Sequence, residues 1–279
     1  MAFIAMTPAA KSTPTDPSFN LSFQTARLSF KPLCLADTLA LHELRTEPEV
    51  MKWSMQKSPD TSLQQTENWI RATITTDIHP FTSDSNREYE EEGSPEKDQT
   101  ESENKSKTNC RSKKNGICFA VRELAYIQSL GNKNGPPQDR IVGSVGIKKA
   151  VSPITERSQY ELGYMFVPRV WGKGYASEAV KGTVRWWFGY LDSLNFSDLE
   201  DSRVDGREGD GGEGEVVDHG RVYALISKKN AASWRVLEKC EFQVVGKGRV
   251  NDDVGIDDGE ELIEFCISRA DVTSVESLI

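Results

Sequence analysis

The feature that most constrains this chain is a strand that runs through a two-glycine turn into a helix. The stretch from Glu161 to Val180 reads ELGYMFVPRVWGKGYASEAV, in which an alternating strand ends at Pro168 and a helix opens after Gly174. The first four amides of a helix lack partners within it, and its N-terminus carries roughly half a positive charge. Gly172 and Gly174 would let the backbone approach a phosphate closely, because neither has a Cβ atom. The turn therefore predicts a phosphate or diphosphate site.

Other phosphate-binding turns fit these residues less well. The chain has no GxxxxGK[ST] Walker loop, and a dinucleotide-binding GxGxxG needs a third glycine where positions 175–177 read YAS. A diphosphate would fit the turn, with Arg169 and Lys173 adding positive charge. A plain tight turn between strand and helix, which binds nothing, remains the alternative.

Periodic runs on both sides of the turn predict a mixed α/β chain. Alternating apolar residues indicate strands, and apolar residues three or four positions apart indicate helices. Apart from the polar tracts, the expected order is strand, two helices, three strands, helix, strand, helix, two strands. The expected strands are 23–32, 117–124, 141–150, 159–167, 221–226, 242–248 and 261–268, and the expected helices are 35–45, 61–75, 174–190 and 231–240.

Polar tracts interrupt this pattern. Residues 82–115, 129–139 and 197–219 are rich in Gly, Ser or charged residues, with too few apolar side chains to offset the entropy of ordering. We expect all of them to be disordered inserts, and we expect residues 83–114 and 198–218 to be dispensable for stability. The first and third account for the net charge of -9, so the acidity says little about a substrate. The expected organisation is a disordered leader at 1–22, one domain over 23–269 and a tail at 270–279.

Composition argues against several classes of protein. No run approaches the roughly 18 apolar residues that a membrane-spanning helix needs, and the N-terminal run has no basic region, so we expect a cytoplasmic protein without membrane contact. No basic face for nucleic acid is evident. The five cysteines and three histidines fall in no metal-ligand spacing, so we expect no metal.

Two motifs resemble those of the GNAT superfamily of N-acetyltransferases. Arg169 to Gly174 fits the loop pattern R/Q-x-x-G-x-G/A, and the run WGKGYASEA resembles the RimJ/RimL branch. Residues 230–242, NAASWRVLEKCEF, resemble the second signature N-x-x-S-x-x-V-L-E-K-x-G-F. Residues 46–53, TEPEVMKW, resemble the acceptor-side helix region. The resemblance covers most of residues 23–268 outside the inserts.

This resemblance implies a fold and a cosubstrate. The fold would be an α/β domain with a mixed, mostly antiparallel sheet flanked by helices. The sheet would open between its fourth and fifth strands, at 159–167 and 221–226, to admit acetyl-CoA. The backbone at 165–167 would pair with the pantetheine arm, and Asn230 and Ser233 would reach the thioester end. The expected cofactor-binding residues are Met165, Phe166, Val167, Arg169, Gly172, Lys173, Gly174, Tyr175, Ala176, Asn230 and Ser233.

The expected reaction is direct attack of an amine on the thioester in a ternary complex. The acceptor nitrogen must lose a proton, and Glu161 is the candidate base because strand alternation sends residues 161, 163 and 165 to one face. Ser233 is the candidate proton donor to the thiolate. In the simpler interpretations, Glu161 pairs with a cation on a neighbouring strand, Asn230 only caps a helix and Ser233 is only solvated.

Two positions depart from the family pattern. Glu241 replaces the glycine that ends the later helix, so that end is expected to be rebuilt, and Leu237 replaces the tyrosine that serves many relatives as general acid. Trp53 is a candidate for the acceptor pocket, which Glu47 and Glu49 could help to make attractive to an ammonium. The acceptor would be a peptide N-terminus or a small amine, and the protein a monomer or homodimer. A non-catalytic acyl-CoA-binding module is the alternative.

Overall fold

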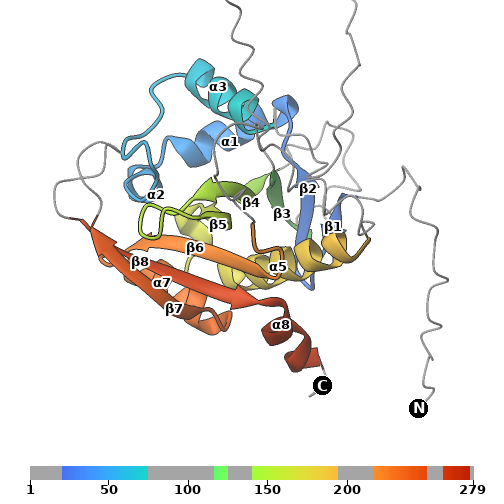
Figure 1. The fold of residues 1–279 in the computed structure, drawn as a ribbon. Coiled ribbons are helices and arrows are strands. Elements are labelled where there is room, and N and C mark those ends of the chain that lie inside the picture. Colours follow the sequence, from blue (N-terminus) through green and yellow to red (C-terminus); the bar gives the residue numbers. More distant parts are fainter. Residues whose placement is uncertain (1–20, 75–115, 125–139, 194–216, 250–259, 277–279) are drawn as a thin grey trace, which may run out of the picture.

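The structure is a computed structural model that describes residues 21–74, 116–124, 140–193, 217–249 and 260–276 (Figure 1). Almost all of the expected leader, the inserts at 82–115 and 129–139, and most of the insert at 197–219 lie outside these residues. In the described part, eight strands form one sheet in the order β1-β2-β3-β4-β5-β6-β8-β7. The strands are β1 (Phe23–Gln24), β2 (Leu28–Pro32), β3 (Gly116–Glu123), β4 (Ile141–Val151), β5 (Ser158–Phe166), β6 (Arg221–Ser227), β7 (Gln243–Arg249) and β8 (Glu261–Ser268).

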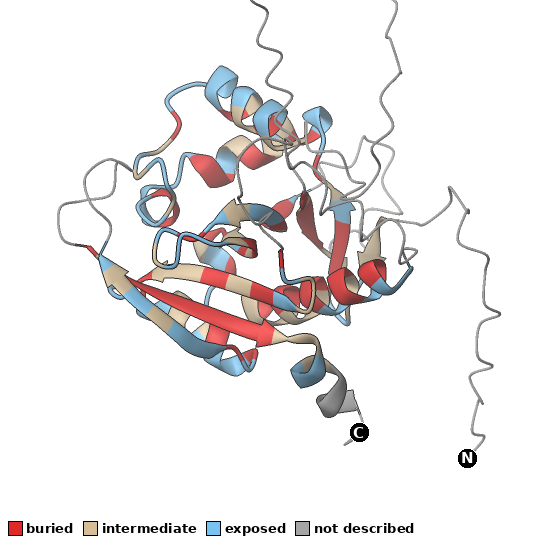
Figure 2. Cartoon of the chain, in the orientation of Figure 1, coloured by how far each residue is buried: buried red, intermediate tan, exposed pale blue. Residues whose placement is uncertain are grey.

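Helices cover both faces of this sheet. Figure 1 shows α1, α2 and α3 on one side and α5 and α7 on the other. Buried residues follow the strands and the inner sides of these helices, so the core consists of two layers separated by the sheet (Figure 2). The helices are η1 (Leu35–Asp37), α1 (Thr38–Arg45), α2 (Pro48–Met51), α3 (Leu63–Ile74), η2 (Pro168–Val170), α5 (Tyr175–Ser193), α7 (Ala231–Lys239) and α8 (Arg269–Glu276).

The mixed, mostly antiparallel fold expected from the sequence is confirmed, and its opening lies between β5 and β6. These strands run parallel and register at a single pair, Glu161 with Tyr223. By contrast, β4 and β5 register over nine pairs, from Gly143–Phe166 to Val151–Ser158. The strands therefore part beyond Glu161 and leave a slot toward their carboxyl ends.

Three segments differ from the sequence expectation. Residues 23–32 form two strands, because Thr25 donates its backbone N–H to the Leu28 carbonyl at 2.9 Å and the chain folds back. This hairpin stacks Phe23 on Phe30 with ring centroids 4.2 Å apart, and it preserves the apolar alternation that suggested one strand. The expected tail begins with helix α8. The expected third insert ends in packed structure, since Val217 is only 7% exposed.

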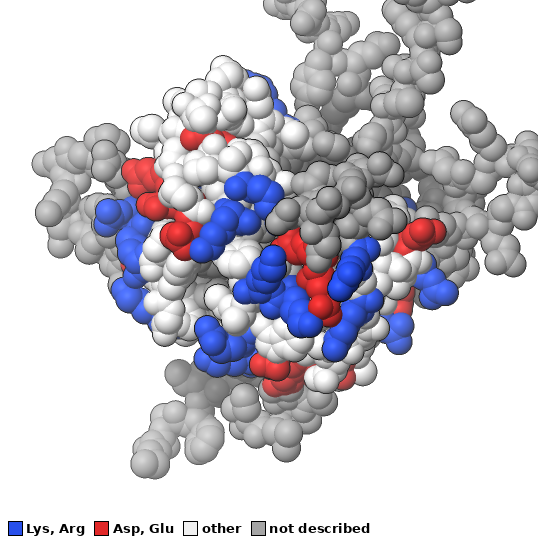
Figure 3. All heavy atoms as spheres, turned by 90° about the vertical axis from the view of Figure 1, so that its left-hand side faces the viewer, with Lys and Arg blue, Asp and Glu red and all other residues white. Residues whose placement is uncertain are grey.

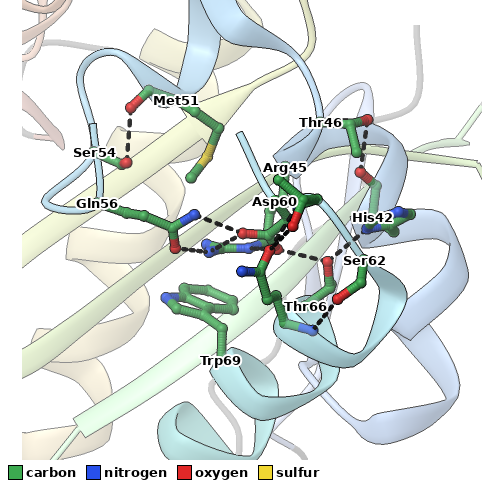
Figure 4. Close-up of polar contacts among 12 residues, drawn as sticks. His42, Arg45, Thr46, Met51, Ser54, Gln56, Asp60, Ser62, Thr66 and Trp69 are labelled. Carbon is green, nitrogen blue, oxygen red and sulfur yellow. Dashed lines mark hydrogen bonds and ion pairs between the residues drawn. The ribbon is translucent and has the colours of Figure 1, made fainter. Parts of the chain in front are cut away.

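A buried ion pair ties α1 to α3 and the loop before it (Figure 4). Arg45 donates to both carboxylate oxygens of Asp60, at 2.7 and 3.0 Å, and to Gln56 at 2.9 Å. Thr66 donates to Asp60 at 2.6 Å, and the Arg45 guanidinium lies 4.5 Å from the centroid of the Trp69 ring. The charges are thus matched by hydrogen bonds on every side, which is the condition under which a buried pair is tolerated.

Replacing Asp60 by Asn should destabilise the fold by about 3–5 kcal/mol at neutral pH, because Arg45 would keep a buried charge without a counter-ion. Burial alone would raise the pKa of Asp60, but hydrogen bonds from Arg45, Thr66 and Gln56 bring it below its usual range. The stabilisation is therefore present above about pH 4 and is lost as pH falls through the lowered pKa. Urea unfolding from pH 7 to 3 should show the gap between the two proteins closing.

A suitable control is Glu67→Gln, which breaks the surface pair with Arg71 on α3. Exposed pairs contribute only about 0–1 kcal/mol. An Asp60→Asn loss no larger than that of the control would contradict the assigned role of the buried pair.

The expected rebuilding of the α7 end is wrong. Glu241 adopts φ 68°, and the backbone N–H groups of Glu241 and Phe242 donate to the Glu238 and Leu237 carbonyls at 3.0 and 3.1 Å. This is the Schellman arrangement that a glycine usually closes, with Phe242 and Leu237 both buried. Packing of Phe242 thus holds a glutamate in the left-handed region.

Glu241→Gly should raise the free energy of unfolding by about 1 kcal/mol, because glycine adopts this φ without a Cβ clash. In contrast, Arg235→Gly, at an exposed interior position of the same helix, should lower it by about 1 kcal/mol. Thermal unfolding of both variants measures the two signs. A destabilising Glu241→Gly would mean that the glutamate side chain stabilises this end.

Candidate functional site

The two-glycine turn has the geometry of an anion site. Gly172 and Gly174 have φ of 73° and 79°, in the left-handed region that favours glycine. The Glu178 backbone N–H donates to the Gly174 carbonyl at 3.0 Å, which makes this the first bond of α5. The three amides between these residues, at positions 175–177, have no hydrogen-bond partner among the described residues. They are the donors that a bound phosphate would use.

Cations surround this turn. Lys173 is exposed at its tip. Arg169 donates through Nη2 to the Ile141 carbonyl at 3.2 Å, and burial together with Arg140 lowers its pKa. Arg169 therefore contacts β4, and Lys173 is the cation left exposed at the tip of the turn.

The backbone of β5 faces the slot at alternate residues. The Val167 N–H donates to the Val142 carbonyl at 3.0 Å, so odd-numbered residues of this strand direct their backbone groups toward β4. Tyr164 and Phe166 therefore face the slot, whereas Met165 faces β4. The Phe166 carbonyl already accepts a 2.7 Å bond from Nε1 of Trp171. The backbone of Tyr164 and the Phe166 N–H are thus the groups that lack a strand to pair with.

The N-terminal turn of α7 forms the opposite wall of the slot. Asn230 is buried and caps α7, since its Oδ1 accepts from the Ser233 backbone N–H at 3.1 Å. The helix cap expected at Asn230 is therefore present. Ser233 is half-buried, and its carbonyl accepts a long bond of 3.4 Å from the Tyr164 hydroxyl. Burial raises the pKa of Tyr164 well above its usual range.

Glu161 lies at the point where β5 and β6 meet. Its register partners are Lys148 on β4 and Tyr223 on β6. Its neighbour Tyr160 contacts Trp187 of α5, so Glu161 and Gly163 face the opposite side, toward α1–α3. No hydrogen bond or ion pair among the described residues holds the carboxylate.

The surroundings of Glu161 favour its neutral form. Burial raises the pKa of Glu161, the charge of Lys148 opposes the rise, and Glu264 adds to it. A Cβ on Gly163 would meet nothing within 4 Å, so the sheet face is open beside the carboxyl group. A half-buried carboxyl group without partners, next to open space, can exchange a proton with a bound molecule.

Glu264 on β8 is a second buried carboxylate on this face, and sequence reasoning missed it. It is 2% exposed, and its Oε1 accepts from Ser152 at 2.7 Å and from Gln159 at 2.8 Å. No local pattern reveals a carboxylate held by side chains 105 and 112 residues away. Tyr164 was missed because only the strand register shows that it crosses to α7.

The loop between α2 and α3 reaches the start of β8. Figure 3 shows the side of the molecule that lies on the left in Figure 1, where Lys and Arg side chains are spread over the surface with acidic side chains between them. Lys57 forms a 3.1 Å ion pair with Glu260 at the start of β8. Trp53 is partly exposed on this loop. Glu49 forms an ion pair with Lys52, whereas Glu47 is exposed.

Leu237 is fully buried, so the position of the usual tyrosine belongs to the core here.

Of the described cysteines, Cys118, Cys240 and Cys266 are not activated as nucleophiles, whereas Cys34 is exposed. Burial raises the pKa of Cys118 to about 12, and the pKa values of Cys240 and Cys266 to about 11. A thiol with such a pKa stays protonated at neutral pH and attacks poorly.

Within the described ranges, no cluster of three or more His, Cys, Asp or Glu residues could hold a metal ion. Each helix of the described chain is too short or too polar to cross a bilayer.

The chain matches the model of a known protein family. Residues 27–243 match the model of the "Acetyltransferase (GNAT) domain". No curated protein sequence matches the chain.

Several solved structures share the fold at low identity. A GNAT-family acetyltransferase from Bacillus anthracis is 17% identical with a TM-score of 0.53, covering 89% of this chain and 98% of that one. Spermidine N-acetyltransferase from Vibrio cholerae, solved with CoA and spermine, is 13% identical with a TM-score of 0.51, covering 89% and 99%. Ribosomal-protein-S5-alanine acetyltransferase from Vibrio fischeri is 14% identical with a TM-score of 0.51, covering 90% and 98%.

Proposed function

This chain belongs to the GNAT acetyltransferase family, and on that premise we propose that it transfers the acetyl group of acetyl-CoA directly to an amine. The observation that carries the proposal is the slot between β5 and β6, which opens beside a turn with two left-handed glycines and three unpartnered helix amides. A slot edged by unpaired backbone groups fits a pantetheine arm, and the turn fits a diphosphate.

The proposed cofactor site combines these two parts. Within the stretch from Arg169 through Ala176, the amides without a partner of their own hold the diphosphate, with Lys173 adding charge. The backbone of Tyr164 and Phe166 pairs with the pantetheine amides, next to the family positions Met165 and Val167. Asn230 holds Ser233 at the thioester end through the cap that it forms on α7.

The proposed chemistry uses Glu161 as the base. Glu161 accepts the ammonium proton, directly or through a water molecule, and the amine nitrogen attacks the thioester carbon. The C–N bond forms, the C–S bond breaks, the nitrogen releases its second proton to solvent, and CoA leaves as a thiolate. The thiolate takes a proton from solvent, directly or through the Ser233 hydroxyl, which recovers its own proton from solvent. The raised pKa values of Cys118, Cys240 and Cys266 support direct transfer over an acetyl-cysteine at these positions.

The acceptor is an amine, and the RimJ/RimL motif favours a peptide N-terminus over a small molecule. Structural neighbours include proteins named for each class, spermidine and a ribosomal protein. We also propose a cytoplasmic location, which the free thiols of the described cysteines fit. A screen of acetyl transfer to N-terminal peptides and small amines tests activity and acceptor together. Acetyl-CoA binding without transfer to any amine would favour a non-catalytic binding module.

Gly174→Val should weaken CoA binding at least about tenfold, because valine resists φ of 79° and blocks the amides from the diphosphate. Gly189→Val is the control within α5, since its backbone is helical and a Cβ there meets nothing within 4 Å, whereas a Cβ on Gly174 would lie 3.5 Å from Nη2 of Arg27. Calorimetry with CoA measures both. An unchanged affinity in folded Gly174→Val would remove the diphosphate assignment.

Glu161→Gln should reduce kcat by about 10²- to 10⁴-fold at neutral pH, because it keeps the shape of the side chain and deletes its basicity. Turnover should partly recover at high pH, where the amine loses its proton in solution. CoA affinity should not change. Glu156→Gln, on the exposed turn of the same β4–β5 hairpin, should leave turnover unaltered.

Protein stability provides a folding control for Glu161→Gln. A carboxyl group whose folded pKa is raised destabilises the fold once it ionises, so wild type should lose stability relative to Glu161→Gln as pH rises above about 4.5. The variant should therefore be at least as stable as wild type at pH 7. Near wild-type turnover across the pH range would remove Glu161 as the base and leave substrate positioning as the mechanism.

A further inference from the structure

Arg27 joins the first hairpin to the two-glycine turn across almost 150 residues of sequence. It lies in the turn between β1 and β2 and donates through Nη1 to the Lys173 carbonyl at 2.9 Å. Its Nε and its backbone N–H donate to the two carboxylate oxygens of Glu178 at 2.6 and 2.8 Å. One side chain therefore holds both the tip of the turn and the first turn of α5.

The Glu178 carboxylate is held in place by hydrogen bonds from the first hairpin. Besides the two bonds from Arg27, it accepts a 2.6 Å bond from the Thr25 hydroxyl. Burial alone would raise its pKa, but these hydrogen bonds lower the pKa of Glu178 below its usual range. The Arg27 guanidinium also lies 4.5 Å from the centroid of the Tyr175 ring, whose hydroxyl donates to Glu123 on β3. The guanidinium is thus held from two sides.

The bond to the Lys173 carbonyl sets the direction of an amide. A trans peptide is planar, with its N–H opposite its C=O, so holding the Lys173 carbonyl toward Arg27 turns the Gly174 N–H the other way. This peptide lies between the two left-handed glycines, whose backbone has few steric restraints of its own. Without Arg27, the peptide could rotate and the amide would lose its fixed direction.

The Nη2 group of the Arg27 guanidinium remains available to donate to a bound anion. The Arg27 side chain is 46% exposed, and Nη2 has no hydrogen-bond partner among the described residues. Nη2 lies 3.5 Å from where a Cβ on Gly174 would be. A positively charged donor therefore stands at the glycine whose missing side chain admits an anion.

We propose that Arg27 is a positioning residue for the coenzyme diphosphate: it orients the Lys173–Gly174 peptide and places Nη2 beside the phosphates. This inference rests on the proposed function of the same turn. A guanidinium serves both tasks because its planar fork donates in several fixed directions at once, whereas an ammonium is a single point charge.

The test compares Arg27→Gln and Arg27→Lys with wild type, using Arg71→Gln as control because it breaks a surface Arg–Glu pair on α3. Calorimetry should show CoA and dephospho-CoA, which both contain the diphosphate, binding about 10- to 100-fold more weakly to Arg27→Gln. Arg27→Lys should also bind more weakly, because it restores charge without the fork. Arg71→Gln should bind normally.

Kinetics separate positioning from general damage to the fold. Arg27→Gln should raise KM for acetyl-CoA and leave kcat within about twofold, because the reacting atoms are untouched. With S-acetyl-pantetheine, which has no diphosphate, Arg27→Gln and wild type should be alike. If Arg27→Gln does not fold, Arg27→Lys serves for the same measurements.

Three results would overturn the inference: unchanged CoA affinity in Arg27→Gln, full recovery in Arg27→Lys, or an equal loss with the donor that lacks a diphosphate. Failure of wild type to bind CoA would instead overturn the proposed function, and the inference with it. The two failures are therefore distinguishable.

Discussion

The structure depends on the point where β5 and β6 meet and then part. Parallel strands normally satisfy each other's backbone along their length, and unpaired groups are costly when buried. Here pairing stops after Glu161, so the backbone of Tyr164 and Phe166 faces a slot. The Trp171 indole satisfies the Phe166 carbonyl, and the Tyr164 hydroxyl reaches across to Ser233. The remaining groups form an edge to which an extended ligand can add as a strand does.

The same strand links the two halves of the proposed reaction. Its backbone edge faces the slot, its even side chains pack toward α5 and α7, and Glu161 and Gly163 face the side of α1–α3. A donor in the slot and an acceptor on that face would therefore meet along β5. The buried Arg45–Asp60 pair joins α1 to the loop before α3, and the Lys57–Glu260 pair joins that loop to the start of β8.

The local sequence pattern predicts the fold and the two-glycine turn, but it does not predict the contacts between distant segments. The glycine turn was predictable because left-handed backbone and a helix start leave a clear local signature. The break within residues 23–32 was not, because a tight hairpin keeps the same alternation as one strand. Arg27 with Glu178 and Gln159 with Glu264 pair across 151 and 105 residues, which no periodicity reports. Glu241 shows the reverse case, in which tertiary packing overrides a local preference.

The buried and half-buried carboxylates of this structure differ in how they are held, and the difference bears on chemistry. Asp60 and Glu178 each accept side-chain hydrogen bonds on both carboxylate oxygens, which fix their geometry and occupy their lone pairs. Such groups serve structure, because taking up a proton would break those bonds. Glu161 has a cation opposite it in register but no hydrogen bond among the described residues, and burial raises its pKa. A carboxyl group that is desolvated yet unbound gains a proton at little structural cost. This contrast, rather than its position alone, supports Glu161 as the proposed base.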